Sequence, residues 1–142
     1  MRFLIAANRG DNKPQDVQVS DAIFDAYMKF NEDLHKAGVL IASEGLNPNG
    51  LRARVGVKNG KRVVVDGPFA ESKELVGGFY LIDVKTKEEA LEWAKRCPVG
   101  LGTDDVLDVF QLTGEDDLPP EIVERIRKVA PTWSAAFTRR AR

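Results

Sequence analysis

The segment from residue 66 to residue 84 constrains the fold of this chain more than any other. Residues 66–69 read Asp-Gly-Pro-Phe, and an acidic residue followed by glycine and proline forces a sharp turn. Gly77 and Gly78 then open an apolar stretch, 79–84, that has the composition of a strand. Two backbone-constraining clusters this close together predict a rigid loop held against the edge of a sheet.

The chain is long enough for one compact domain and too short for two, because it has 142 residues. Its net charge of −1 favours neither nucleic acid nor a membrane surface, and no apolar run approaches the roughly 20 residues of a membrane span. We therefore expect no membrane partner, and the net charge gives no argument for a nucleic-acid partner. The single cysteine, Cys97, excludes an internal disulfide, is expected to be a buried small hydrophobe, and favours a reducing, cytoplasmic location.

Several common types of functional site are absent from the sequence. One histidine and one cysteine cannot build a Cys/His zinc site, and neither a phosphate-binding P-loop nor a G-x-G-x-x-G motif occurs. We expect no metal and no cofactor, and neither nucleotide hydrolysis nor dinucleotide-dependent redox chemistry.

The first part of the chain has a strand–helix–strand pattern. Residues 2–7 predict a strand, and Ser20 is placed to cap a helix that runs to about residue 37, before Gly38. Residues 39–43 predict the next strand. One face of the helix is apolar and should pack on a sheet; it consists of Ile23, Tyr27, Phe30, Leu34 and Ala37.

A hairpin and a second strand–helix–strand pattern follow. Asn59-Gly60 favours a tight turn between strands 51–57 and 61–65. After the central strand 78–84, the sequence Thr-Lys-Glu-Glu at 86–89 is a capping box that begins a helix ended by Pro98. The remaining predicted elements are a strand at 106–112 and a third helix that starts at the proline pair 119–120.

This order of elements predicts an α+β fold, the ferredoxin-like split βαβ sandwich, with one antiparallel sheet and both helices on one face. Apolar residues point to both faces of the strands, and one layer of helices cannot cover both. A second copy packed sheet against sheet is the simplest cover, so we expect a homodimer.

Three segments carry a family resemblance: residues 34–40, residues 66–71 and residues 77–94. In order and spacing they resemble the YCII-related domains, in particular the DGPF subgroup, from Met1 to about Leu112. The resemblance implies a bacterial protein whose sheets pair into a dimeric α/β barrel, with a cleft between sheet and helices. We expect a domain over 1–114 and, over 115–142, an extra C-terminal helix and basic tail that pack on the domain or on the dimer partner.

The resemblance also implies two classes of function. Some YCII-type proteins are thought to use a His–Asp pair, and one branch acts in aromatic-ring catabolism as a dehydrochlorinase. DGPF members are often encoded beside extracytoplasmic-function sigma factors. The chain is thus expected to be either a small cofactor-independent enzyme acting on a modest organic ligand, or a non-catalytic regulatory module. It departs from many relatives at 23–25, where they have a second histidine near the start of the first helix.

Candidate catalytic residues are the single histidine, His35, and two carboxylates, Asp66 and Glu44. An imidazole at the flank of the first helix can act as acid or base, or it can simply favour the helix C-terminus and bond a backbone carbonyl. Asp66 can be the partner of His35 or the acceptor within its own turn. Glu44 ends the second strand and is the other candidate partner.

Ligand contacts are expected from Arg54 on the hairpin, which would suit an anionic group or simply face solvent, and from Tyr80 on the central strand. The aspartates near the last strand are expected to be loop charges: Asp104, Asp105 and Asp108. The basic C-terminal segment either docks on the protein or touches nucleic acid.

Overall fold

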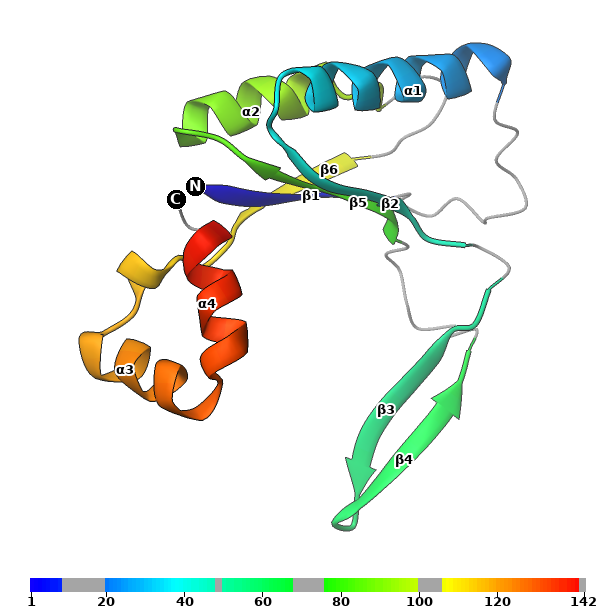
Figure 1. Cartoon of the computed structure of the whole chain (residues 1–142). Helices are drawn as coiled ribbons and strands as arrows, with labels where there is room; N and C mark the ends of the chain where they lie inside the picture. Colours follow the sequence, from blue (N-terminus) through cyan, green and yellow to red (C-terminus); the bar gives the residue numbers. More distant parts are fainter. Residues whose placement is uncertain (9–19, 48–49, 68–75, 100–105, 141–142) are drawn as a thin grey trace.

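The computed structural model describes residues 1–8, 20–47, 50–67, 76–99 and 106–140. Four strands form an antiparallel sheet in the order β2-β5-β1-β6. Their bounds are β1 (Arg2–Asn8), β2 (Leu40–Gly45), β5 (Val76–Asp83) and β6 (Val106–Gln111). Helices α1 (Asp21–Lys36) and α2 (Lys87–Arg96) both cover one face of this sheet (Figure 1). The predicted ferredoxin-like α+β fold is confirmed.

The core fills the space between this sheet and the two helices. Phe30 of α1 meets the ring of Tyr80 edge-on, with centroids 5.2 Å apart, and lies 6.5 Å from the ring of Trp93 in α2. Leu34 and Ile82 are fully buried beside them. The predicted alternation of the central strand is confirmed, because Tyr80, Ile82 and Val84 are buried whereas Phe79, Leu81 and Asp83 are only half-buried.

Both helices begin where their capping residues predict. The Ser20 hydroxyl accepts a hydrogen bond from the backbone N–H of Ile23 at 3.3 Å. The Thr86 hydroxyl accepts from the N–H of Glu89 at 3.1 Å, and the Glu89 carboxylate accepts from the N–H of Lys85 at 3.1 Å. The bonds that Ser20 and Thr86 accept satisfy backbone donors that the first helical turn leaves without a partner, and the bond that Glu89 accepts fixes the residue before the Thr86 cap.

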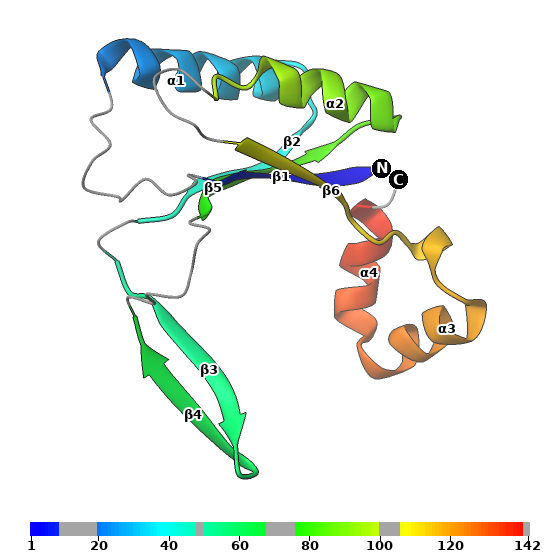
Figure 2. The ribbon, with the colours of Figure 1, turned by 180° about the vertical axis from the view of Figure 1, so that it is seen from behind.

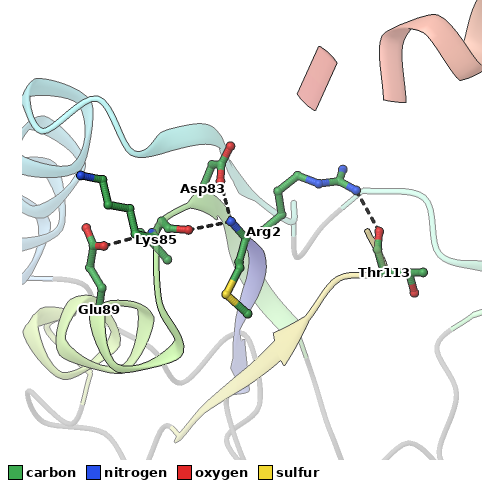
Figure 3. A network of polar contacts seen from close by, with 7 residues as sticks. Arg2, Asp83, Lys85, Glu89 and Thr113 are labelled. Atoms are coloured by element: carbon green, nitrogen blue, oxygen red, sulfur yellow. Dashed lines mark hydrogen bonds and ion pairs between the residues drawn. The ribbon is translucent and has the colours of Figure 1, made fainter. Parts of the chain in front are cut away.

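The N-terminus ties the ends of three strands together, and most of the residues involved are labelled in Figure 3. The amino group of Met1 donates to the Val84 carbonyl at 2.6 Å and to the Asp83 carboxylate at 3.1 Å. Arg2 donates to the Thr113 carbonyl at 3.1 Å. The end of β1 is thereby fixed to the segments that follow β5 and β6.

The hairpin of β3 (Ala53–Lys58) and β4 (Lys61–Asp66) is a separate two-stranded sheet. Asn59 and Gly60 have φ values of 52° and 74°, the left-handed geometry that a tight hairpin turn requires, so the predicted turn is confirmed. Both views show the hairpin extending from the side of the main sheet opposite α1 and α2 (Figures 1 and 2).

The loop predicted between the two backbone-constraining clusters lies mostly outside the described residues, over 68–75. At its start, the N–H of Gly67 donates to the Arg52 carbonyl at 2.7 Å. At its end, Gly78 lies so close to β2 that an added Cβ atom would stand 2.8 Å from the Glu44 carbonyl oxygen. Strand pairing with β2 therefore requires a glycine at position 78.

The C-terminal segment holds two α-helices, where one was predicted. After a short 3-10 helix, η2 (Glu115–Asp117), come α3 (Pro120–Val129) and α4 (Pro131–Arg140). Pro131 lacks an N–H and disfavours helical geometry in the residue before it, and Ala130 has φ −133° and ψ 64°. The predicted third helix is confirmed as α3, and α4 is a further helix that the sequence analysis did not predict. No helix in the described part of the chain is long and apolar enough to cross a membrane.

Candidate functional site

The sheet face opposite α1 and α2, here called the open face, carries both apolar and acidic side chains. Side chains alternate along a strand, so the neighbours of core residues point to this face. Phe110 and Val106 at its β6 edge are 54% and 56% exposed. Its members are Leu4, Ala6, Asn8, Ala42, Glu44, Phe79, Leu81, Val106, Asp108 and Phe110.

One row of side chains crosses all four strands of the open face. In the strand register Glu44 lies opposite Phe79, Phe79 opposite Ala6, and Ala6 opposite Asp108. This cross-strand row thus has a carboxylate at each end and a phenyl ring with a methyl group between them. Three strand spacings separate the end residues by about 14 Å. The carboxylates do not meet, and the surface between them is apolar.

The carboxylate of Asp108 is held in place by Asn8. The Asn8 side-chain amide donates to Asp108 across the β1–β6 pair, and Asn8 is only 7% exposed. A buried amide with a fixed partner orients the carboxylate and leaves its other oxygen able to accept a further hydrogen bond. Glu44, at the other end of the row, is exposed.

A second row on the open face is wholly apolar. Leu81 lies opposite both Ala42 and Leu4, and Leu4 lies opposite Phe110. This apolar row adjoins the cross-strand row two residues further along each strand, about 7 Å away.

The predicted catalytic residues lie on three different parts of the fold. His35 is exposed in the last turn of α1, where its own carbonyl accepts from the N–H of Gly38 at 3.0 Å. Asp66 is exposed at the end of β4, and Glu44 lies on the open face. Since α1 and the hairpin are on opposite sides of the sheet (Figure 1), one copy of the chain does not bring His35 and Asp66 together.

Of the predicted ligand contacts, Arg54 is exposed on β3 opposite Val65, and Tyr80 belongs to the core. Burial, with smaller contributions from Cys97 and Tyr27, raises the pKa of the Tyr80 hydroxyl well above its usual range. Cys97 is buried as predicted, and burial raises the pKa of its thiol to about 11.

Sequence reasoning missed Phe79, Asn8 and the position of Asp108. Asp108 was predicted to be a loop charge, but it lies within β6. The available signal was a charged residue inside an apolar run, since Val-Leu-Asp-Val-Phe occupies 106–110. Over the described ranges, no group of three or more His, Cys, Asp or Glu is placed to hold a metal ion.

Comparisons with known proteins place this geometry in context. The model of the YCII-related domain matches residues 1–112. An uncharacterized protein of Rhizobium meliloti is 43% identical over 60 residues, which are 42% of this chain and 48% of that protein. The match thus spans about half the length of this curated relative.

Among solved structures, 5-chloro-2-hydroxyhydroquinone dehydrochlorinase from Burkholderia phenoliruptrix AC1100, in complex with 2,5-dihydroxybenzoquinone, is similar over 84% of this chain and 100% of its own. The TM-score is 0.46 and the identity 17%.

Proposed function

This chain belongs to the YCII-related family, by its match over residues 1–112, and we propose that it binds a modest organic molecule on the open face of its sheet. The observation that carries this proposal is the cross-strand row, in which Phe79 and Ala6 lie between Glu44 and Asp108. Aromatic compounds with hydroxyl groups are the ligand class that fits such a surface best. Membership of the DGPF subgroup stays a prediction.

The row supplies two kinds of contact to such a ligand. The ring of Phe79 offers an apolar contact for another ring, and the methyl group of Ala6, which is 7% exposed, lies beside it. An ionised carboxylate accepts hydrogen bonds from hydroxyl groups and can take a proton from an acidic substrate. Glu44 and Asp108 can therefore orient a hydroxylated ring from its two sides, and Glu44 is the proposed proton acceptor. The proposed chemistry uses only side chains of the protein.

A second copy of the chain is part of the proposal. Phe110 and Val106 are more than half exposed in a single copy. Burying a large apolar side chain in a dimer interface stabilises the dimer by about 1.5–3 kcal/mol. Two open faces packed sheet against sheet, about 10 Å apart, would cover the apolar row and close the space above the cross-strand row. The assembly would be the dimeric α/β barrel that the sequence predicts.

The geometry supports Glu44, rather than a His35–Asp66 pair, as the general acid or base. His35 is exposed in the last turn of α1, and α1 covers the face of the sheet opposite the open face (Figure 1). The same observation favours one second candidate function, a binding or regulatory module that holds the ligand without converting it.

Binding of small probes to purified protein tests the proposal. Catechol, benzoate and cyclohexanol distinguish an aromatic site with hydroxyl recognition from an anion site and from a non-specific apolar surface. We expect catechol to bind most tightly, and Glu44→Gln to weaken it about tenfold, the loss of one hydrogen bond to a charged group. Glu92→Gln, an exposed position on α2, is the matched control.

The proposal is wrong if catechol binds Glu44→Gln and Phe79→Leu as tightly as the unaltered protein. An assay for turnover of a bound ligand that resembles the substrate separates the two candidate functions. Conversion that is lost in Glu44→Gln supports the enzyme, and binding without conversion supports the module.

A further inference from the structure

The β3–β4 hairpin is unusually exposed for an element rich in valine. Val55, Val57 and Val64 are 63%, 70% and 67% exposed. A lone two-stranded hairpin is only marginally stable in water, and exposed apolar side chains gathered on one element mark an interaction surface. The described hairpin pairs with no strand of the main sheet, so its apolar side chains need a cover from elsewhere.

The hairpin is also strongly basic. Residues 51–66 contain five basic side chains and a single acidic one, Asp66. Three of the basic residues surround the turn at its end and form what we call the basic tip, which consists of Lys58, Lys61 and Arg62. A partner surface for this tip should be acidic.

An acidic surface of matching kind lies in the C-terminal segment of the same chain. The acidic turn is η2, Glu115–Asp117, which joins β6 to α3. Its shape is held by the Glu115–Arg127 ion pair and by a hydrogen bond from the Gly114 N–H to the Asp117 carboxylate at 2.7 Å. Asp116 stays exposed, as does Glu121 in the first turn of α3.

The basic tip and the acidic turn belong to opposite ends of the strands. The hairpin is connected at Gly45 and Val76, which lie at the Asn8 end of β1. The acidic turn follows β6 where Gln111 pairs with Phe3, at the other end of β1. The hairpin and the C-terminal helices both lie on the open-face side of the sheet (Figures 1 and 2). Within one copy they are therefore separated by the length of the strands.

A two-fold axis removes this separation. When the axis lies between two facing sheets and runs perpendicular to the strands, each end of one sheet faces the opposite end of the other. The hairpin of one copy then lies beside the acidic turn of the second. Its six-residue strands extend about 20 Å, twice the roughly 10 Å between facing sheets, so the tip reaches past the partner's sheet.

We propose that the hairpin of each copy clasps the C-terminal segment of the second copy, with the basic tip on the acidic turn. The hairpin valines would cover apolar side chains at the start of α3, where Ile122 is 41% exposed. This inference rests on the sheet-to-sheet dimer of the proposed function and adds to it a specific contact made twice by symmetry.

Charge reversal on each side tests the contact. Lys58→Glu with Lys61→Glu should weaken dimerisation about tenfold at low salt, measured by sedimentation equilibrium, and the difference should shrink at high salt. Asp116→Lys with Glu121→Lys should do the same. Lys85→Glu with Lys87→Glu, on the helix side of the sheet, is the matched control and should leave dimerisation unchanged.

Mixing the two reversed proteins gives the decisive readout. In a mixed dimer every reversed hairpin meets a reversed turn and every unaltered hairpin meets an unaltered turn, so heterodimers should form at least as tightly as the unaltered dimer. Circular dichroism confirms that each variant is folded. As a second measurement, a short bismaleimide should join an Arg62→Cys copy to an Asp116→Cys copy, while buried Cys97 stays unreactive.

The outcomes distinguish this inference from the proposed function. An unaltered protein that is monomeric at all concentrations overturns both. A stable dimer that dissociates in Phe110→Asp, yet is indifferent to both charge reversals and gives no cross-link, keeps the sheet-to-sheet assembly and overturns the clasp. Weakened variants that recover on mixing support the clasp.

Discussion

Replacing Gly78 by alanine tests the strand pairing that positions the cross-strand row. An added Cβ atom would stand 2.8 Å from the Glu44 carbonyl oxygen and 3.3 Å from the Cα atom of Gly45, both backbone atoms of β2. Backbone in a paired strand cannot swing aside like the end of a side chain, so β2 must move. Overpacking of this kind costs about 1–3 kcal/mol. For a chain of this length, 2 kcal/mol lowers Tm by about 6 °C.

Gly45→Ala is the matched control, because an added Cβ atom there has nothing within 4 Å although Gly45 is the strand partner of Gly78. Thermal unfolding of both variants, followed by circular dichroism, separates the close contact from the general effect of replacing glycine. Gly78→Ala should also weaken catechol binding, since the displaced strand carries Glu44. Equal Tm values for the two variants would show that the approach of β2 to Gly78 does not constrain the fold.

Two further predictions follow from buried and exposed titratable residues. Between pH 9 and pH 11 the folded chain keeps the Cys97 proton that the unfolded chain releases. The contribution of Cys97 to folding stability is therefore constant below this range and falls within it by up to about 1.4 kcal/mol per pH unit. Denaturant titrations should show a shallower fall in Cys97→Ala, and equal slopes would contradict the assignment. His35→Ala should leave catechol affinity within twofold of the unaltered protein, because His35 is exposed on the far side of the sheet; a tenfold loss would restore the predicted histidine site.

The parts of the fold that the sequence predicts are those that neighbouring residues determine. The Asn59-Gly60 turn, the Thr86 cap and the alternation of Tyr80 with Phe79 each depend on a few adjacent positions. The boundary between α3 and α4 is also determined by neighbouring residues, since Pro131 disfavours helical geometry in the residue before it.

The candidate site depends instead on register between strands that are distant in sequence. Glu44, Phe79, Ala6 and Asp108 form a row only because four strands align with one particular offset. A shift of one residue in any pair would send one of these side chains into the core. Composition and spacing along the chain do not contain this offset. His35 shows the same limit, because helical periodicity placed it beside the core stripe and left open whether a neighbouring element would cover it.

The two rows of the open face make assembly and ligand binding interdependent. The apolar row through Leu81, Leu4 and Phe110 favours contact with a second copy. The cross-strand row, which carries Glu44 and Asp108, lies about 7 Å from this apolar row. Carboxylates are costly to bury without hydrogen-bond donors. When two sheets pack on their apolar rows, the carboxylates of the cross-strand row are therefore buried and require hydrogen-bond donors. A hydroxylated ligand supplies them. A ligand that binds only the closed dimer stabilises that dimer by RT ln(1 + [L]/Kd) for each site. The dissociation constant of the dimer should therefore fall as the catechol concentration rises above its own Kd.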